Sequence, residues 1–215
     1  MENLTVSFDG EGIVNVVPDE ALLSLNVSAR SLQSPQEAAA LQANKARNLI
    51  AYLRNAKVPE GKVSTSNYQC GPVLRYDDVR RENVPTGEYV ANQNFEVRVE
   101  KSVASQVSAA VVEWASLQQL TFVVSRELNK KKKEEATELA ICDAEYRAKK
   151  RESRLGIRLG EVLGFTESSG GNHDRRYAAK SFALAGAEAM DCNAPELTAG
   201  ETEVSTSVVI TYKLR

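Results

Sequence analysis

The chemistry open to this chain depends on a single histidine. His173 is the only histidine among the 215 residues, and a Ser-His-Asp or Cys-His site would have to use it as the general base. It lies in the polar, glycine-containing stretch 170–175, which we expect to be a surface loop. A base on a mobile loop is held too loosely for catalysis. We therefore expect no catalytic residues and no enzymatic activity.

The sequence gives little support for a metal site, a reactive thiol or a phosphate-binding loop. A zinc centre takes about four Cys or His ligands at close spacing, whereas Cys70, Cys142 and Cys192 are scattered. A hydrolase that uses Cys70 or Cys142 is the weakest interpretation. The Gly-Glu-Gly sequence at 10–12 lies between two expected strands, while a phosphate loop leads into a helix. We expect these glycines to form a bulge or a tight turn with positive φ. No cofactor, metal or small-molecule substrate is expected.

Three carboxylates could be considered for acid–base or metal chemistry: Asp19, Asp77 and Asp78. Each lies beside turn residues, where Asp is common because its side chain hydrogen-bonds the local backbone. We therefore expect all three to have structural roles.

The most distinctive local feature of the sequence is a cluster of basic residues at 130–158. It contains ten Lys or Arg and six Asp or Glu, which gives +4, while the rest of the chain carries −6. One interpretation is a patch for an anionic partner, namely an acidic protein, lipid headgroups or nucleic acid. The other, which we favour, is a solvated helix with i,i+4 ion pairs, because Tyr146 is the only aromatic residue available for base stacking. The candidate patch consists of Lys149, Lys150, Arg151 and Arg154.

Composition limits the class of protein. The net charge of −2 argues against a nucleic-acid partner, since such domains are usually strongly basic. The longest apolar stretch, 109–124, is interrupted by polar residues, which excludes a membrane span. The residues after Met1 form neither a basic nor an apolar signal region. The chain is therefore either cytoplasmic or an exported protein whose signal peptide has been removed.

Hydrophobic periodicity predicts about eight strands and three helices, an α+β fold with a mostly antiparallel sheet and the helices packed on it. We expect one domain over residues 1–215, or two interlocked subdomains, and a mobile loop at 168–200. The helices should follow Ser34, follow Ser102 and span 130–155. The strands are expected at 4–8, 13–17, 21–29, 63–76, 88–100, 120–125, 161–166 and 202–214.

The last strand is a candidate for self-assembly. Val204, Val208 and Ile210 give it an apolar, β-branched face, and it contains no Pro to block its edge. Two arrangements are open: an exposed edge that pairs with another copy, or central pairing with the first strand.

Several sequence landmarks in order resemble the SIMPL-domain family, which includes bacterial periplasmic immunogenic and oxidative-stress-defence proteins and a eukaryotic protein that binds a Pelle-like kinase. Residues 10–19 read GEGIVNVVPD, close to the family pattern G-E-G-x-V-x-x-x-P-D. Residues 63–68 resemble its T-S-N strand, and residues 87–92 its G-Y-x-A strand entry. Asp143-Ala144, residues 159–163 and residues 201–212 fit the remaining segments.

The resemblance implies an α+β fold, no known enzymatic activity, frequent export in bacteria and action by self-assembly or partner binding. We therefore expect a non-enzymatic, homo-oligomeric protein of envelope or oxidative-stress physiology, with a periplasmic location if a signal peptide was removed. The alternative is a cytoplasmic adaptor whose basic helix, 130–158, binds an acidic protein or nucleic acid.

Overall fold

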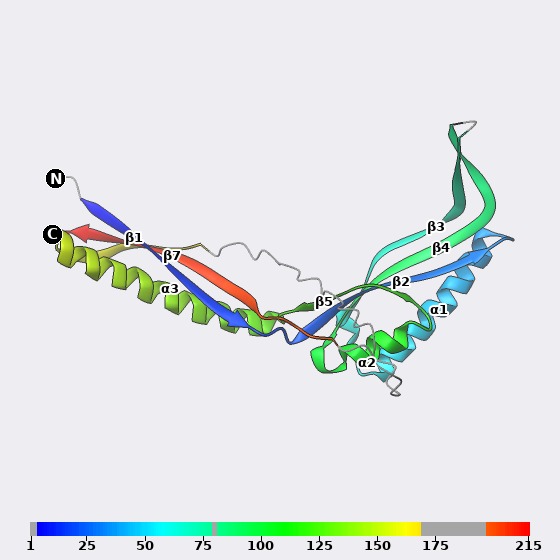
Figure 1. The fold of residues 1–215 in the computed structure, drawn as a ribbon, viewed down its shortest axis with the longest axis horizontal. Coiled ribbons are helices and arrows are strands. Elements are labelled where there is room, and N and C mark those ends of the chain that lie inside the picture. The colour runs from blue at the N-terminus through cyan, green and yellow to red at the C-terminus, as the bar shows by residue number, and fades with distance from the viewer. Residues whose placement is uncertain (1–3, 79–80, 169–196) are drawn as a thin grey trace, which may run out of the picture. The chain divides into compact units, whose positions relative to one another are not determined.

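The computed structural model describes residues 4–78, 81–168 and 197–215. The α+β class and the antiparallel pairing are confirmed, with seven strands in these ranges instead of about eight. In chain order the elements are β1 (Thr5–Val16), β2 (Glu20–Ser31), α1 (Pro35–Asn55), the short 3-10 helix η1 (Glu60–Lys62), β3 (Val63–Asp77), β4 (Glu82–Glu100), α2 (Lys101–Val111), β5 (Ser116–Val123), α3 (Arg126–Leu155), β6 (Leu159–Ser168) and β7 (Thr202–Leu214) (Figure 1).

The strands form two sheets instead of one, and each sheet belongs to its own compact unit. The first unit contains the sheet β1-β7-β6 and helix α3. It therefore combines the first strand of the chain with elements that follow β5 in the sequence. The second unit contains the sheet β3-β4-β2-β5 with α1 and α2. Two sheets are needed because β1 pairs with the distant β7 and not with its sequence neighbour β2.

In the first unit, α3 lies along β1 and β7 (Figure 1). It packs on them through small residues. A Cβ added to Gly10 would lie 2.1 Å from the carbonyl oxygen of Ala140, and one added to Gly12 would lie 1.9 Å from that of Ala136. Glycine in a strand interior often marks such a close backbone approach. The expected turn with positive φ is therefore wrong: β1 runs continuously through both glycines, and neither has a positive φ.

Helix α3 contributes an alanine stripe to this contact. Its buried residues recur every four positions, which places them on one face of the helix: Ala136, Ala140, Ala144 and Ala148. The facing side of β7 supplies Val208 and Ile210, which complete the small buried cluster.

The ends of α3 explain why it is longer than expected. The Ser125 hydroxyl accepts a hydrogen bond from the Leu128 backbone N–H at 3.3 Å, so the helix starts at Arg126 and not at residue 130. Glu127 occupies the first turn, where a negative charge suits the helix dipole, and the four lysines 130–133 follow only after that turn. Gly156, with φ of 64°, ends the helix as expected.

In the second unit, the predicted apolar stripes form the core. Alternate residues of β2, from Ala21 to Val27, point toward the helices and are fully buried. The Ser34 hydroxyl caps α1 by accepting from the Glu37 N–H at 3.2 Å, as the sequence predicts. The remaining core members are Ala46, Leu49, Leu53, Val58, Phe95, Val97, Val99, Ala104, Val107, Val111 and Ala115.

A chain of polar side chains leads from the core to the surface between α1 and the sheet. Gln42 is 2% exposed, and its amide donates to the Gln93 side-chain oxygen at 2.8 Å. Gln93 in turn donates to the Thr65 hydroxyl at 3.1 Å. Because buried polar groups are costly without partners, this chain favours one register of α1 on β4 and β3.

Glu20, the first residue of β2, is paired with two cations. The Glu20 carboxylate is largely buried and lies 2.6 Å from Lys62 Nζ and 4.0 Å from Arg98. Its hydrogen bond and its negative charge raise the pKa of Lys62 above the ordinary value. The pair ties η1 to the sheet beside the first residue of β3.

The glycine–alanine contact gives a direct test. We expect Gly12→Ala to destabilise the first unit by more than about 2 kcal/mol, because the added methyl would overlap a helix carbonyl. Urea unfolding followed by circular dichroism measures the loss. Gly71→Ala is the control, since nothing lies within 4 Å of its added Cβ. Equal stability of the two variants would contradict the close-approach role.

Candidate functional site

In the described part of the chain, the residues considered for chemistry lie on separate elements. Cys70 and Cys142 are exposed free thiols in different units, on β3 and α3. His173 and Cys192, and most of the expected mobile loop, 168–200, lie outside the described residues. Within the described ranges, no group of three or more His, Cys, Asp or Glu side chains is placed to hold a metal ion.

The three candidate carboxylates lie where strands begin or end. Asp19 precedes β2, and its carbonyl accepts from the Lys101 N–H at 2.9 Å. Asp77 is the last residue of β3 and pairs with Glu82 of β4, and Asp78 follows it in the turn. These positions agree with structural roles next to turns.

The terminal strand β7 adopts the central arrangement of the two left open by its sequence. It pairs with β1 on one side and β6 on the other, so both of its edges are occupied within the chain. Val204, Val208 and Ile210 are buried beneath α3. The outer strands of this sheet are therefore β1 and β6, and any pairing with another chain at an edge falls to them.

The edge of β1 is blocked by side chains of α3. Asp143 accepts a hydrogen bond from the Glu11 backbone N–H at 3.1 Å. Arg147 lies 2.8 Å from Asp143 and 2.8 Å from Asp9 of β1, so the two helix residues form one cluster with the strand. Charged groups at a strand edge oppose pairing with a further strand. Sequence reasoning missed this cluster, although Asp143 and Arg147 stand at i and i+4.

The edge of β6 is different because apolar side chains line it. Val162, Leu163 and Phe165 are 55%, 48% and 50% exposed. Helix α3 lies over β1 and β7, and β6 follows them in the sheet order. A bulge in the ladder pairs Val162 with Tyr212 and Phe165 with Ile210, which places both side chains on the side of the sheet that α3 covers. Among the described residues, the middle of this edge has no neighbouring strand and lies next to exposed apolar side chains.

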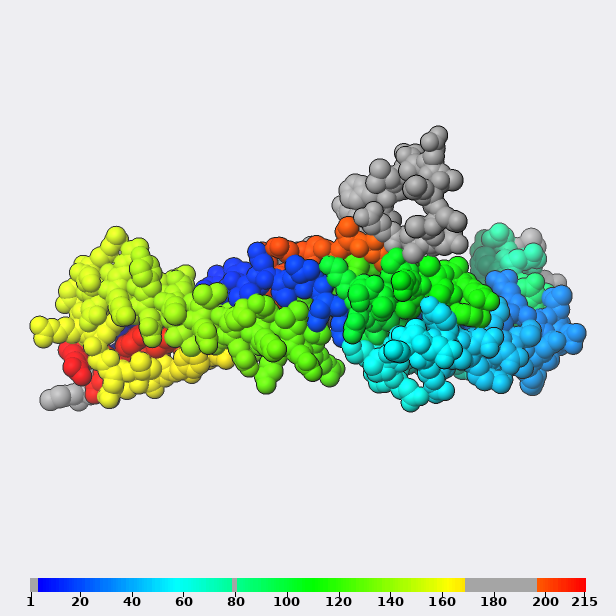
Figure 2. Space-filling view, turned by 90° about the horizontal axis from the view of Figure 1, so that it is seen from below, coloured from blue at the N-terminus to red at the C-terminus, as the bar shows by residue number. Residues whose placement is uncertain are grey.

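The basic patch lies at the end of α3, where the helix dipole favours cations. Lys149, Lys150, Arg151 and Arg154 are all exposed, and the C-terminal half of α3 (yellow-green) lies at the surface in Figure 2. Lys150 Nζ sits 5.5 Å from the centre of the Tyr146 ring. Among the described residues, no carboxylate forms an ion pair with any of the four.

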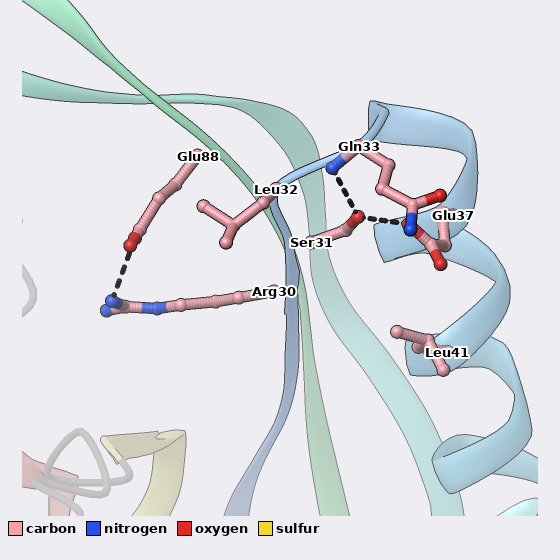
Figure 3. Close-up of a pocket in the computed structure, with 7 residues that line it drawn as sticks. All are labelled: Arg30, Ser31, Leu32, Gln33, Glu37, Leu41 and Glu88. Atoms are coloured by element: carbon pink, nitrogen blue, oxygen red, sulfur yellow. Dashed lines mark hydrogen bonds and ion pairs between the residues drawn. The ribbon is translucent and has the colours of Figure 1, made fainter.

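A shallow groove in the second unit lies between the start of α1 and the end of β2 (Figure 3). Its volume is about 350 Å³. Its charged groups already satisfy one another, since Arg30 lies 3.4 Å from Glu88 and the Ser31 hydroxyl donates to Glu37. What the groove leaves uncovered is the apolar surface of Leu32 and Leu41.

The described helices are each too short or too polar to cross a lipid bilayer. A family model with the description "SIMPL: Protein of unknown function (DUF541)" matches residues 6–212, nearly the whole chain. The chain belongs to the SIMPL family. It is also similar to the 26 kDa periplasmic immunogenic protein of Brucella melitensis biotype 1 and of Brucella abortus strain S19. Each is 24% identical over 219 residues, which cover 98% of this chain and 84% of the relative.

The landmarks that first suggested the SIMPL family have defined structural roles in this chain. The Gly-Glu-Gly sequence allows β1 to approach α3, and Glu11 between the glycines gives its N–H to Asp143. The second landmark strand contributes Asn67, which pairs with Asn94 of β4. Gly87, at the entry of the third landmark, has a φ of 84°, a conformation that favours glycine.

Asp143 offers a test of the blocked edge. We expect Asp143→Ala to cost about 1 kcal/mol of unfolding free energy, because the Glu11 N–H loses its acceptor and Arg147 loses one of its two anions. Chemical denaturation measures this loss. Glu138→Ala, an exposed position of the same helix, is the control and should change stability by less than about 0.5 kcal/mol. An Asp143 variant as stable as this control would show that the edge contact contributes nothing.

Proposed function

We propose that this chain is an exported, non-enzymatic protein of the bacterial envelope that acts by associating with itself. Its similarity to two proteins named as periplasmic supports the location. The resemblance to oxidative-stress-defence proteins favours a role in stress physiology. The observation that carries self-association is the uncovered apolar edge of β6.

An outer strand with unpaired backbone groups is a template for another strand. A second copy related by a two-fold axis near Leu163 and Gly164 would place Val162 opposite Phe165 of the other copy, and the reverse. Both side chains lie on the same side of the sheet because of the bulge. Such pairing would join two three-stranded sheets into one of six strands and cover apolar surface on both copies.

The other outer strands are less suited to this pairing. The β1 edge carries the Asp143–Arg147 cluster. The β3 edge includes Pro72, which has no N–H to donate. The β5 strand is only eight residues long. Among the outer strands of the described residues, β6 combines exposed Val162 and Phe165 with contacts to α3 that lie near its two ends, at Leu159 and Glu167.

The test is the mass of the protein in solution. We expect light scattering to give an oligomer, and the double variant Val162→Glu/Phe165→Glu to lower its mass, because pairing would bring four carboxylates together. Leu139→Glu is the control, since Leu139 is also 50% exposed but lies on α3. A wild-type protein that is monomeric at every concentration would refute self-association. An unchanged mass in the double variant would refute the role of β6.

The second candidate function is a cytoplasmic adaptor that binds an acidic protein or nucleic acid through the basic patch. The observation that favours it is the set of four exposed cations without carboxylate partners in the described residues. Against it, cations at a helix C-terminus are already favoured by the helix dipole, and the chain as a whole is slightly acidic.

Replacing Lys149, Lys150 and Arg151 with Gln separates the two functions. If the patch is only solvated, we expect unchanged mass and a stability change within about 0.5 kcal/mol. The measurement is salt-dependent binding to duplex DNA, to an acidic polypeptide such as polyglutamate and to anionic vesicles. Binding that is lost in the triple variant, together with recovery of the native protein in the cytoplasmic fraction, would favour the adaptor.

A further inference from the structure

One end of the first unit gathers cations from three segments of the chain: the end of α3, the residue before β6 and the residue after β7. Figure 1 shows the end of α3 beside the tip of β7. The Arg215 N–H donates to the Arg158 carbonyl at 2.9 Å, and the Leu159 N–H donates to the Glu152 carboxylate of α3 at 2.9 Å. We call this surface the basic end, and its members are all exposed: Lys149, Lys150, Arg151, Arg154, Arg158 and Arg215.

The charges at this end are not balanced. Residues 149–161 and 213–215 contain seven Lys or Arg and two Glu, a side-chain charge of +5 in a chain of −2. Both carboxylates are already engaged, since Glu152 accepts from the Leu159 N–H and Glu161 lies 4.0 Å from Lys213. Among the described residues, no carboxylate forms an ion pair with a member of the basic end. Its cations are therefore available to an anionic partner.

The helix dipole accounts for only part of this surface. It favours cations in the last turn of α3, but the effect falls off beyond that turn. Leu159 pairs with Leu214, which places Arg158 opposite Arg215. Like charges opposite each other on neighbouring strands are destabilising. A ligand with negative charges would remove this repulsion.

Exposed apolar side chains lie next to these cations. Leu155, at the end of α3, is 65% exposed. Leu4 is 70% exposed, and its carbonyl accepts from the Leu214 N–H at 2.9 Å, beside Arg215. Tyr146 is 62% exposed and lies one helical turn before Lys150. Leucine and tyrosine among Lys and Arg are typical of a surface that lies in the headgroup region of a bilayer.

We propose that the basic end docks on the surface of an anionic phospholipid bilayer. Its cations attract the lipid phosphates, and this attraction increases with each Lys or Arg near the surface. Leu4 and Leu155 enter the boundary between headgroups and acyl chains, where apolar side chains leave water. Nucleic acid fits this surface less well, because Tyr146 alone is there for bases to stack on among the described residues. An acidic polypeptide would engage the cations but leave both leucines in water.

This inference goes beyond the proposed self-association and takes from the proposed function only the envelope location, which places the protein next to lipid bilayers. The basic end uses side chains other than Val162 and Phe165, so the two surfaces can be changed separately. Failure of self-association appears as a monomeric mass in solution, and failure of docking appears as absent binding to lipid.

The experiment measures cosedimentation of the full chain with vesicles of phosphatidylcholine and phosphatidylglycerol in equal parts. We expect wild type to bind these vesicles, to bind less at high salt, and not to bind vesicles of phosphatidylcholine alone. Lys150→Gln/Arg154→Gln/Arg158→Gln should weaken binding at least about tenfold, since each cation near the surface contributes. The matched control removes three exposed cations from the other end of α3 and should bind as wild type does: Arg126→Gln/Lys130→Gln/Lys131→Gln. Circular dichroism checks that both variants are folded.

Leu155→Ser distinguishes a lipid surface from other polyanions. It should weaken vesicle binding at least about threefold, because an apolar contact with the bilayer is lost. A wild-type protein that does not bind the anionic vesicles, or an equal loss in the two triple variants, would overturn the proposal. Vesicle binding that Leu155→Ser leaves unchanged would also overturn it, since the contact would then depend on charge alone. Tighter binding to duplex DNA or to polyglutamate than to the vesicles would assign the surface to that polyanion instead.

Discussion

Gly10 and Gly12 bring the backbone of β1 so close to α3 that no Cβ fits between the strand and the carbonyls of Ala136 and Ala140. This contact determines how the first unit is built. Alanine and glycine bury little apolar area, so the hydrophobic contribution of α3 is small compared with that of a helix rich in Leu. Close packing of backbone atoms and the Asp143–Arg147 cluster must supply the remaining attraction. The alanine stripe of α3 packs on the sheet, so the other faces of the helix can carry charged residues.

The same contact explains which strand edge is open. Because α3 lies against β1 and β7, its side chains reach the edge of β1, while on β6 they contact Leu159 and Glu167 near the two ends and leave Val162 and Phe165 exposed. One edge of the sheet is therefore blocked by charge and the other is lined with Val162 and Phe165. If two copies paired through β6 as proposed, the joined sheet would end at its two β1 edges, where the charged cluster opposes a further strand.

Sequence periodicity predicted the elements more reliably than their partners. The bounds of β7, the Ser34 cap of α1 and the apolar stripe through Leu49 and Leu53 follow from local rules, and the structure confirms them. The role of Gly10 and Gly12 could not be predicted locally, because it depends on a helix about 130 residues later in the chain. For the same reason the division into two sheets and the Asp143 contact to Glu11 were missed. These depend on long-range pairing, which hydrophobic spacing does not encode.

The hairpin of β3 and β4 extends past β2 because the paired strands differ in length. Strand β4 has 19 residues and β2 only 12, so part of β4 must extend past its neighbour. In a globular domain such an extension usually ends in polar residues, which cost little when they stay in water. Here the extension alternates, with Leu74 and Tyr76 on one face and Arg75 and Asp77 on the other. An alternating pattern is typical of a strand with one covered face, and no described element of the second unit covers it. The pattern therefore leaves the apolar side chains of the hairpin uncovered by the described elements of its own unit.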